Sequence, residues 1–229
     1  MKKGFVNWSG GKDALMALHQ LKKDDELNVD LLLSIINKDS QKTSLHEIPL
    51  HLLKKQAEFL NCKFEFVEVP DQVDNKTYQK LIFKKWLSLM ERGYQYAVFG
   101  DIFLEDIRTF REEQLQSVGL KGVFPLWKKS TDQLADFFID QKYKAIVVSC
   151  EADQLDESFC GKNYDQEFVE SLPSNVDPCG ENGEFHTFCY DGPLFSKPIT
   201  FSKLNKTLIS YPSPDPTKKA YKIWSQPID

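Results

Sequence analysis

The chain has 229 residues, of which 41% are hydrophobic and 28% are charged, and its net charge at pH 7 is -5. This length is enough to bury a core in one large domain or two small ones, and the composition is that of an ordinary globular protein. A net negative charge gives no general attraction to nucleic acid or to an anionic membrane. We therefore expect no direct nucleic-acid partner and no membrane partner.

Cysteine usage and the lack of targeting signals suggest a cellular compartment. No apolar run approaches the roughly 20 residues of a membrane span, and the N-terminus lacks the pattern of a signal peptide. The five cysteines are odd in number and form no C-x-x-C pair. This pattern argues against a disulfide framework and against a zinc or iron–sulfur site. The expected location is the cytoplasm, with reduced thiols.

The first informative stretch lies close to the N-terminus. An apolar run ending at Trp8 is followed by the loop Ser9-Gly10-Gly11-Lys12-Asp13 and then by apolar residues at helical spacing over 15–21. This pattern predicts a buried strand, a tight loop and an amphipathic helix. Paired glycines allow close approach to a ligand, and the first N–H groups of a helix attract a phosphate. The alternative is an ordinary turn capped by Ser9 or Asp13.

Strand and helix patterns alternate along the next part of the chain. The further strands are expected at residues 29–36, 64–69 and 96–99, and the further helices at 49–60 and 76–91. This alternation, without an internal repeat, predicts an α/β fold with a doubly wound parallel sheet. Because ligands of such sheets bind outside the carboxyl ends of the strands, the loops that follow the strands should share one rim.

Charged residues follow the fourth expected strand. From Asp101 to Glu112 they recur three or four positions apart and include Arg108. If this segment is helical, the charges form one polar face with internal ion pairs. A solvated helix face is the usual outcome for such spacing. Asp101, however, stands at the carboxyl end of a strand, where we expect the cleft.

The pattern restarts beyond residue 125. A helix is expected around 134–138 and a strand at 145–149. We therefore expect a nucleotide-binding domain over residues 1–125 and a smaller α+β, substrate-binding domain over residues 126–229.

The second informative stretch runs from Asp177 to Thr187. Its Asn182-Gly183 pair predicts a tight hairpin turn. In a strand beyond that turn, Glu184 and His186 would lie on one face. Carboxylates, an imidazole and a hydroxyl around one turn suit the binding of a polar substrate or the transfer of a proton. A hydrated surface hairpin is the alternative.

Taken together, these stretches resemble the diphthine–ammonia ligase family of the PP-loop ATP pyrophosphatases. The first loop is similar to the S-G-G-x-D-[ST] motif of that superfamily, with Ala14 at the position of its Ser or Thr. The G-D-I segment is Gly100–Ile102, and the C-terminal motif G-E-x-G-E-[FY]-H-T is Gly180–Thr187. Further matches lie at residues 44–46, 125–127 and 191–193. The resemblance covers about residues 4–195 and implies an adenine nucleotide alpha hydrolase-like fold.

The reaction that this resemblance implies is ATP-dependent amidation. The carboxylate of diphthine, a modified histidine on elongation factor 2, would attack the α-phosphorus of ATP, and ammonia would then displace AMP. The nucleotide-binding residues implied in this way are Ser9, Gly10, Gly11, Lys12, Asp13, Ala14 and His46. Because Mg²⁺ prefers oxygen ligands, Asp13 is the expected magnesium ligand.

The remaining roles concern catalysis and the acceptor. The expected catalytic residues are Lys12, Asp13, Glu184 and His186. Lys12 would absorb charge on the leaving pyrophosphate, and Glu184 or His186 would accept a proton as the amine attacks. The expected substrate-binding residues are Asp101, Arg108, Glu181, Asn182, Gly183, Glu184, His186 and Thr187.

Three other interpretations stay open. The same adenylation could act on a different small-molecule or protein carboxylate, as expected of bacterial relatives. A tRNA-modifying enzyme of the superfamily is disfavoured by the missing C-x-x-C pairs and the acidic net charge. A non-catalytic sensor of ATP or AMP is compatible with Ala14. The sequence also leaves open the nitrogen source and the formation of a homodimer.

Overall fold

The computed structural model describes residues 1–22, 26–43, 47–211 and 220–229. The first half of the chain forms a five-stranded parallel sheet with the strand order β3-β2-β1-β4-β5. The strands are β1 (Lys2–Asn7), β2 (Leu27–Asn37), β3 (Lys63–Val69), β4 (Tyr94–Val98) and β5 (Lys121–Val123). The expected doubly wound parallel sheet is therefore confirmed.

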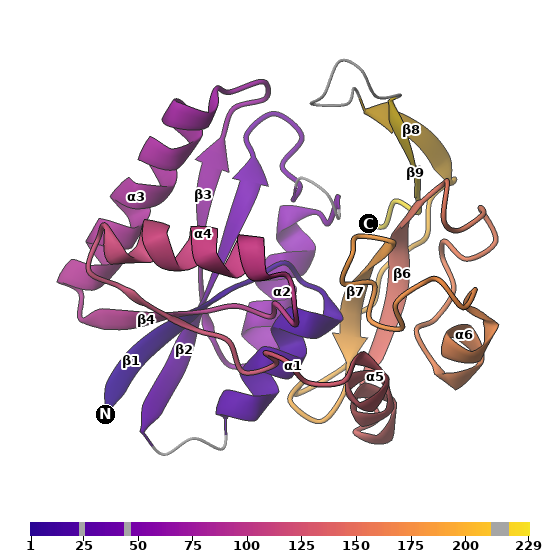
Figure 1. Ribbon diagram of the computed structural model, residues 1–229, viewed down its shortest axis with the longest axis horizontal. Coiled ribbons are helices and arrows are strands. Elements are labelled where there is room, and N and C mark those ends of the chain that lie inside the picture. The colour runs from indigo at the N-terminus through magenta and orange to yellow at the C-terminus, as the bar shows by residue number, and fades with distance from the viewer. Residues whose placement is uncertain (23–25, 44–46, 212–219) are drawn as a thin grey trace.

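Helices cover both faces of this sheet (Figure 1). They are α1 (Lys12–Leu21), α2 (Leu50–Phe59), α3 (Asn75–Glu91) and α4 (Glu105–Gln116). The chain moves outward from β1 to β3 and then returns past β1 to β4. Because such crossovers are right-handed, α1 and α2 lie on one face, and α3 and α4 lie on the other. The reversal between β1 and β4 is where a doubly wound sheet binds its ligand.

The second half of the chain is built around a four-stranded sheet with the order β7-β6-β9-β8. Its strands, antiparallel to their neighbours, are β6 (Lys144–Glu151), β7 (Phe185–Asp191), β8 (Thr207–Tyr211) and β9 (Tyr221–Ser225). Two helices accompany it, α5 (Thr131–Asp140) and α6 (Gln166–Ser171). The expected smaller α+β part is confirmed, whereas β5, α6, β8 and β9 were not predicted.

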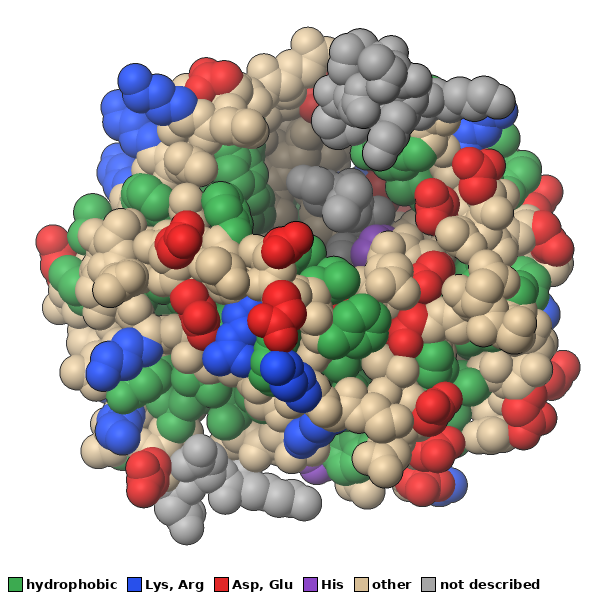
Figure 2. All heavy atoms as spheres, viewed as in Figure 1, with side chains coloured by type: hydrophobic (Ala, Val, Ile, Leu, Met, Phe, Trp, Pro, Cys, Tyr) green, Lys and Arg blue, Asp and Glu red, His purple; other side chains and the backbone are tan. Residues whose placement is uncertain are grey.

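One apolar core joins the two halves. Leu15 and Leu18 of α1 belong to the same buried cluster as Phe138 of α5 and Phe188 of β7. As a result α1 lies between the two sheets, and the loop before it is fixed from both sides (Figure 1). Figure 2 shows that the surface is hollowed between the two halves, in the upper middle of the view. The predicted domain boundary near residue 125 stays a prediction.

The turn at Asn182-Gly183 differs from the expectation. Gly183 has a φ of 90°, and its N–H donates to the Gly180 carbonyl at 3.0 Å, so a turn does form. Strand β7, however, begins only after the turn and pairs with β6. The backbone before the turn is bound by the side chain of Asp177 rather than by a strand. The predicted hairpin is therefore wrong.

Gly100 brings the loop after β4 against the start of α1. A Cβ at this position would lie 2.7 Å from the carbonyl carbon of Asp13 and 2.9 Å from the nitrogen of Ala14. Both are backbone atoms within or next to a helix, so a larger residue would force the two segments apart. This approach places Asp101 near Asp13. Burial raises the pKa of Asp101, and the Asp13 carboxylate adds a smaller contribution to that rise.

Two further findings concern the state of the cysteines and the length of the helices. All five cysteines carry free thiols. Four of them are buried, and Cys62 is partly buried. Within the described ranges, no helix is long and apolar enough to cross a membrane.

Candidate functional site

The loop between β1 and α1 is held by residues from two other segments, α2 and β7. Gly10 has a φ of 85°, in the region that favours glycine. Its carbonyl accepts hydrogen bonds from the Cys189 N–H and from Gln56 Nε2, both at 2.9 Å. The N–H of Lys12 donates to Thr187 Oγ1 at 3.1 Å. Strand β7 is thus part of the wall of this loop.

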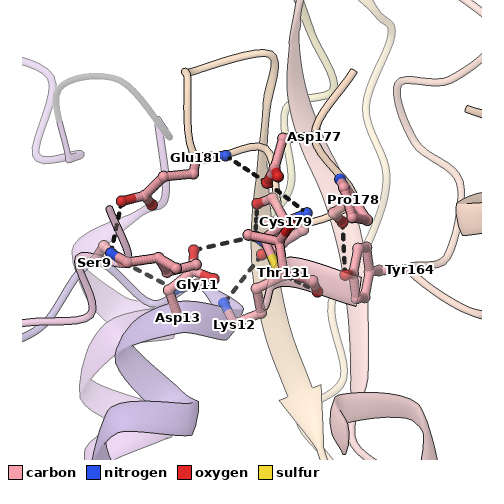
Figure 3. A network of polar contacts seen from close by, with 12 residues as sticks. Ser9, Gly11, Lys12, Asp13, Thr131, Tyr164, Asp177, Pro178, Cys179 and Glu181 are labelled. Carbon is pink, nitrogen blue, oxygen red and sulfur yellow. Dashed lines mark hydrogen bonds and ion pairs between the residues drawn. The ribbon is translucent and has the colours of Figure 1, made fainter. Parts of the chain in front are cut away.

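Lys12 is enclosed where the two halves meet (Figure 3). Its side chain is 1% exposed, and Nζ donates to the Cys179 carbonyl and, at 3.1 Å, to Asp13 Oδ2. The ammonium also lies 5.5 Å from the ring centre of Tyr164 and 5.1 Å from that of Phe185. Burial lowers the pKa of Lys12, but the neighbouring Asp13 carboxylate outweighs burial and raises it. The expected direct contact of Lys12 with a phosphate stays a prediction.

Asp13 offers an oxygen to a cation. Oδ2 binds Lys12, whereas the buried Oδ1 has no hydrogen-bond partner within the described part of the chain. Burial raises the pKa of Asp13, Lys12 opposes this rise, and Asp177 adds to it. Mg²⁺ is usually held by one or two carboxylates together with water and substrate phosphates, so it fits Oδ1. Among the described residues, no three metal-binding side chains converge on one point.

The segment from Asp177 to Glu184 is shaped by its own carboxylates. Asp177 Oδ1 accepts the N–H groups of Cys179 at 2.9 Å and of Glu181 at 3.2 Å. Glu184 Oε1 accepts the Asp177 N–H at 3.1 Å and Asn182 Nδ2 at 3.0 Å. Glu184 is 3% exposed. In this structure Glu184 and Asn182 support the segment, and their expected roles toward a substrate stay predictions.

Glu181 joins this segment to the rim of the parallel sheet. Its Oε1 accepts the N–H groups of Ile102 at 2.6 Å and of Phe103 at 3.3 Å. Burial raises the pKa of Glu181 to about 7; the two N–H donors oppose this rise, and the Asp13 and Asp101 carboxylates add to it. The C-terminal motif and the G-D-I segment are therefore in direct contact.

Arg111, rather than Arg108, pairs with Asp101. Arg111 Nε lies 2.8 Å from Asp101 Oδ2, and Nη2 lies 3.2 Å from Oδ1. Burial raises the pKa of Asp101, while Arg111 opposes this rise. Arg108 donates instead to Glu112 at 2.9 Å and lies 4.6 Å from the ring centre of Trp127. The structure brings Asp101 into the site, and the expected substrate role of Arg108 stays a prediction.

The remaining expected residues lie in different settings. His186 is partly buried, and burial together with the charge of Lys12 lowers its pKa to about 4. Its imidazole is therefore neutral at pH 7. Gly183 lies at the open tip of its turn, since no other group comes within 4 Å of where its Cβ would be. His46, like the rest of the 44–46 match, lies outside the described residues.

A cavity of about 430 Å³ opens between α3 and α4 near the carboxyl edge of the sheet. Asn7 of β1, Ile35 of β2 and Phe99 after β4 line it, together with Arg111. Trp86 of α3 also lines it, and its buried Nε1 has no hydrogen-bond partner in the described ranges. The cavity thus combines apolar walls with an available donor and borders the Asp101–Arg111 pair.

Sequence reasoning missed three residues of this site. Gln56, Arg111 and Asp177 were not among the expected site residues. A signal existed for Gln56, because it is a polar residue between Leu53 and Ala57 on the apolar stripe of α2. The roles of Arg111 and Asp177 depend on loop geometry that residue spacing does not specify.

The raised pKa of Glu181 predicts a pH-dependent stability. Between its ordinary pKa and about 7, the native protein binds the Glu181 proton more tightly than the unfolded chain does. The stability that this proton contributes is complete below the ordinary pKa and is lost as the pH rises through about 7. Glu181→Gln keeps the acceptor oxygen without the charge, so the variant should gain stability over the wild type as the pH rises from 5 to 8. Urea unfolding at each pH measures the difference.

Glu157→Gln is a suitable control for that comparison, because it makes the same change at an exposed position. The free energy of unfolding of this control should change with pH as that of the wild type does. Parallel pH profiles for the Glu181→Gln variant and the wild type would contradict the assignment.

Comparison with solved structures gives only distant likenesses. A U34-tRNA thiolase from Methanococcus maripaludis aligns with a TM-score of 0.39 at 13% identity, over 60% of this chain and 57% of that chain. A predicted subunit of tRNA methyltransferase from Methanocaldococcus jannaschii aligns with a TM-score of 0.41 at 17% identity, over 69% of this chain and 84% of that chain. Both TM-scores are below 0.5, so the fold class rests on the strand order and directions of this chain.

Sequence relatives are more informative. The human and bovine diphthine–ammonia ligases are each 32% identical to this chain over 102 residues, which is 42% of this chain and 38% of each relative. The Schizosaccharomyces pombe diphthine–ammonia ligase is 31% identical over 99 residues, 42% of this chain and 16% of that protein. The matched region thus spans well under half the length of these relatives.

Family models cover both halves of the chain in order. The diphthamide synthase N-terminal domain matches residues 2–122, and the diphthamide synthase C-terminal domain matches residues 130–211. The first match alone spans more than half of the chain. With both domains present in one order, this protein belongs to the diphthamide synthase family.

Proposed function

We propose that this protein is an ATP-dependent ligase of the diphthine–ammonia type, which converts a carboxylate into an amide and ATP into AMP and pyrophosphate. One observation carries the proposal: the Ser9–Asp13 loop is in direct contact with the C-terminal motif. Lys12 donates from its N–H to Thr187 and from its ammonium to the Cys179 carbonyl. A reaction between a nucleotide and an acceptor needs their two binding segments side by side.

We place the phosphates of ATP against the loop and its base in the cavity between α3 and α4. The loop offers the backbone N–H groups of a helix start and the positive charge of Lys12. Apolar side chains such as Ile35 and Phe99 suit a planar base, and Trp86 Nε1 offers it a hydrogen bond. Asn7, at the end of β1, lies two residues before the loop, so one nucleotide can span both.

Asp13 Oδ1 is the proposed ligand for magnesium. Mg²⁺ would neutralise part of the charge on the triphosphate and on the leaving pyrophosphate. The Lys12 ammonium keeps Asp13 Oδ2 engaged, so the carboxylate has a fixed orientation. This chain would therefore contribute an oriented carboxylate to the metal.

The reaction has two steps. In the first, an oxygen of the acceptor carboxylate bonds to the α-phosphorus of ATP, and the bond to the bridging oxygen of the β-phosphate breaks. In the second, the nitrogen of ammonia bonds to the acyl carbon, the bond to AMP breaks, and one proton leaves the nitrogen. Each step requires the nucleotide and the acceptor to be bound next to one another, which the contact between the two halves of the chain supports.

Glu181 is the best-matched acceptor for that proton. A general base works best when its pKa lies near the working pH, and the pKa of Glu181 is raised to about 7. Among the residues expected for this role, His186 has a pKa lowered to about 4 and is a weak base. Glu184 already binds Asp177 and Asn182 through one oxygen. Glu181 is also partly exposed, so it can exchange the proton with solvent.

The proposed acceptor is diphthine on elongation factor 2, because the named relatives are diphthine–ammonia ligases. The chemistry itself requires only a carboxylate. We expect the protein with Mg-ATP to release AMP and pyrophosphate when ammonium and a diphthine-bearing factor are both present. Mass spectrometry should show the factor losing about one mass unit, the change from acid to amide. Elongation factor without diphthine is the control.

Other outcomes of this assay would favour a different acceptor or a protein without ligase activity. If AMP is released equally with and without diphthine on the factor, the acceptor would be a different carboxylate. Nucleotide binding without AMP under any condition would contradict the ligase proposal and favour a sensor.

Filling the cavity between α3 and α4 should block the nucleotide. Ile35→Trp places a larger ring in the cavity, and Ile35 is only partly buried, so the fold should tolerate it. We expect the affinity for Mg-ATP to fall about 10-fold or more, because the base loses its apolar site. Isothermal titration calorimetry measures this. Leu87→Trp, on an exposed position of α3 that does not line the cavity, should bind as the wild type does; equal losses in both variants would count against the cavity.

Removing the charge of Asp13 should weaken magnesium use. Asp13→Asn keeps the shape but loses the ionised oxygen that we assign to the metal. We expect AMP formation at saturating ATP to fall by about 10²-fold or more, with a higher magnesium concentration at half-maximal rate. Steady-state rates over a magnesium series measure both effects. Asp132→Asn, an exposed position in α5, is the matched control. An unchanged magnesium dependence in the Asp13→Asn variant would remove Asp13 from this role.

A further inference from the structure

Gln56 of α2 lies at the junction of three segments and is 0% exposed. Its Oε1 accepts a hydrogen bond from Trp8 Nε1 at 2.7 Å. Its Nε2 donates to the Gly10 carbonyl at 2.9 Å and to the Cys189 carbonyl at 2.7 Å. One side chain therefore connects the end of β1, the loop and strand β7.

The chemistry of these partners fixes the orientation of the amide. The indole nitrogen of Trp8 can only donate, so it must face Oε1. The two backbone carbonyls can only accept, so they must face the two hydrogens of Nε2. Each donor and acceptor of this buried amide is then matched. A carboxylate of the same shape would turn an oxygen toward two carbonyl oxygens, which is repulsive.

Binding the Gly10 carbonyl also orients the next amide of the loop. In a trans peptide the C=O of one residue and the N–H of the next point in opposite directions. The Gly10 carbonyl faces Gln56 and β7, so the Gly11 N–H points to the other side of the loop. There it donates to Ser9 Oγ at 3.2 Å. Since both residues are glycines, the peptide could rotate easily without such anchors.

We propose that Gln56 is a positioning residue for the nucleotide. By binding the Gly10 carbonyl, it keeps that oxygen away from the phosphates. It also keeps the Gly11 N–H on the opposite side of the loop, where a phosphate would take the place of Ser9 Oγ as its acceptor. Strand β7 acts with it, because the Cys189 N–H binds the same carbonyl at 2.9 Å. The inference rests on the proposed function, since it assumes that the loop binds a nucleotide.

The test compares Gln56→Glu with the wild type in binding α,β-methylene-ATP and Mg²⁺, at pH 8 and at pH 5.5. At pH 8 the ionised variant should bind at least about 10-fold more weakly, because the Gly10 and Cys189 carbonyls each lose the hydrogen bond from residue 56 and face a carboxylate oxygen instead. At pH 5.5 a protonated carboxyl can donate again, so the ratio of variant to wild-type affinity should recover toward one. Gln133→Glu, the same change at an exposed position of α5, should bind as the wild type does at both pH values.

A second variant and a spectroscopic signal separate positioning from simple unfolding. Gln56→Met keeps an unbranched chain of similar length without charge, so it is expected to fold even if Gln56→Glu does not. Circular dichroism at 10 °C confirms that each protein is folded before it is titrated. In ¹H–¹⁵N spectra of the wild type, the Gly11 amide should shift when the analogue binds. In either folded variant the free Gly11 signal should already differ, and its shift on binding should shrink.

The outcomes distinguish this inference from the proposed function. Equal affinity of the wild type and both folded variants, with unchanged Gly11 signals, would overturn the role of Gln56 and leave the ligase proposal standing. A wild type that binds no analogue would overturn both. Weaker binding by Gln56→Met that does not vary with pH, together with recovery by Gln56→Glu at pH 5.5, would support positioning.

Discussion

The burial of the Lys12 ammonium constrains the site more than any other interaction. An ammonium removed from water is very costly unless it is paired and hydrogen-bonded. Here the partners come from both halves of the chain: Asp13 follows it in the loop, and the Cys179 carbonyl lies in the C-terminal segment. The faces of Tyr164 and Phe185 complete its surroundings. The loop and that segment must therefore be in place together, or the charge is left without partners.

A group of carboxylates surrounds this one cation. Burial raises the pKa of Asp13, Asp101 and Glu181, and neighbouring carboxylates add to each rise, including that of Asp177 on Asp13. Lys12 and Arg111 compensate part of this negative charge. Such an arrangement is poorly balanced by the protein alone and would gain from an added divalent cation. The charge balance of these residues thus supports the proposed binding of a metal-bound triphosphate.

Features of the fold that depend on neighbouring residues in the sequence could be predicted, whereas features that depend on contacts between distant segments could not. The first strand, the loop and α1 follow from local periodicity, and the buried Leu15 and Leu18 confirm that periodicity. The three-residue strand β5 is too short to leave a pattern, and it forms because its neighbour β4 offers an open edge. The predicted hairpin at Asn182-Gly183 was wrong because the turn signal is local, whereas pairing depends on what precedes the turn.

The site residues show the same limit. Glu181 was expected near a substrate, but its bonds to the Ile102 and Phe103 amides depend on how two distant loops meet. Arg108 and Arg111 are equivalent in the charge pattern, and only the start of α4 decides which of them faces Asp101. Gln56 was visible as a polar residue on an apolar stripe, yet its three partners lie up to 133 residues away in the chain.

The two-residue period of β7 explains why the C-terminal motif contacts the Ser9–Asp13 loop. Side chains two apart in a strand share a face, so Phe185, Thr187 and Cys189 point the same way. Phe185 packs on Lys12, and Thr187 accepts the Lys12 N–H. Strand β7 is also an edge strand of its sheet, which leaves the Cys189 N–H and C=O for Gly10 and Gln56. An open strand edge that would otherwise invite foreign pairing is thereby used to hold the loop. The C-terminal half therefore helps to hold the Ser9–Asp13 loop, and a change in β7 would reach the proposed nucleotide site through the backbone.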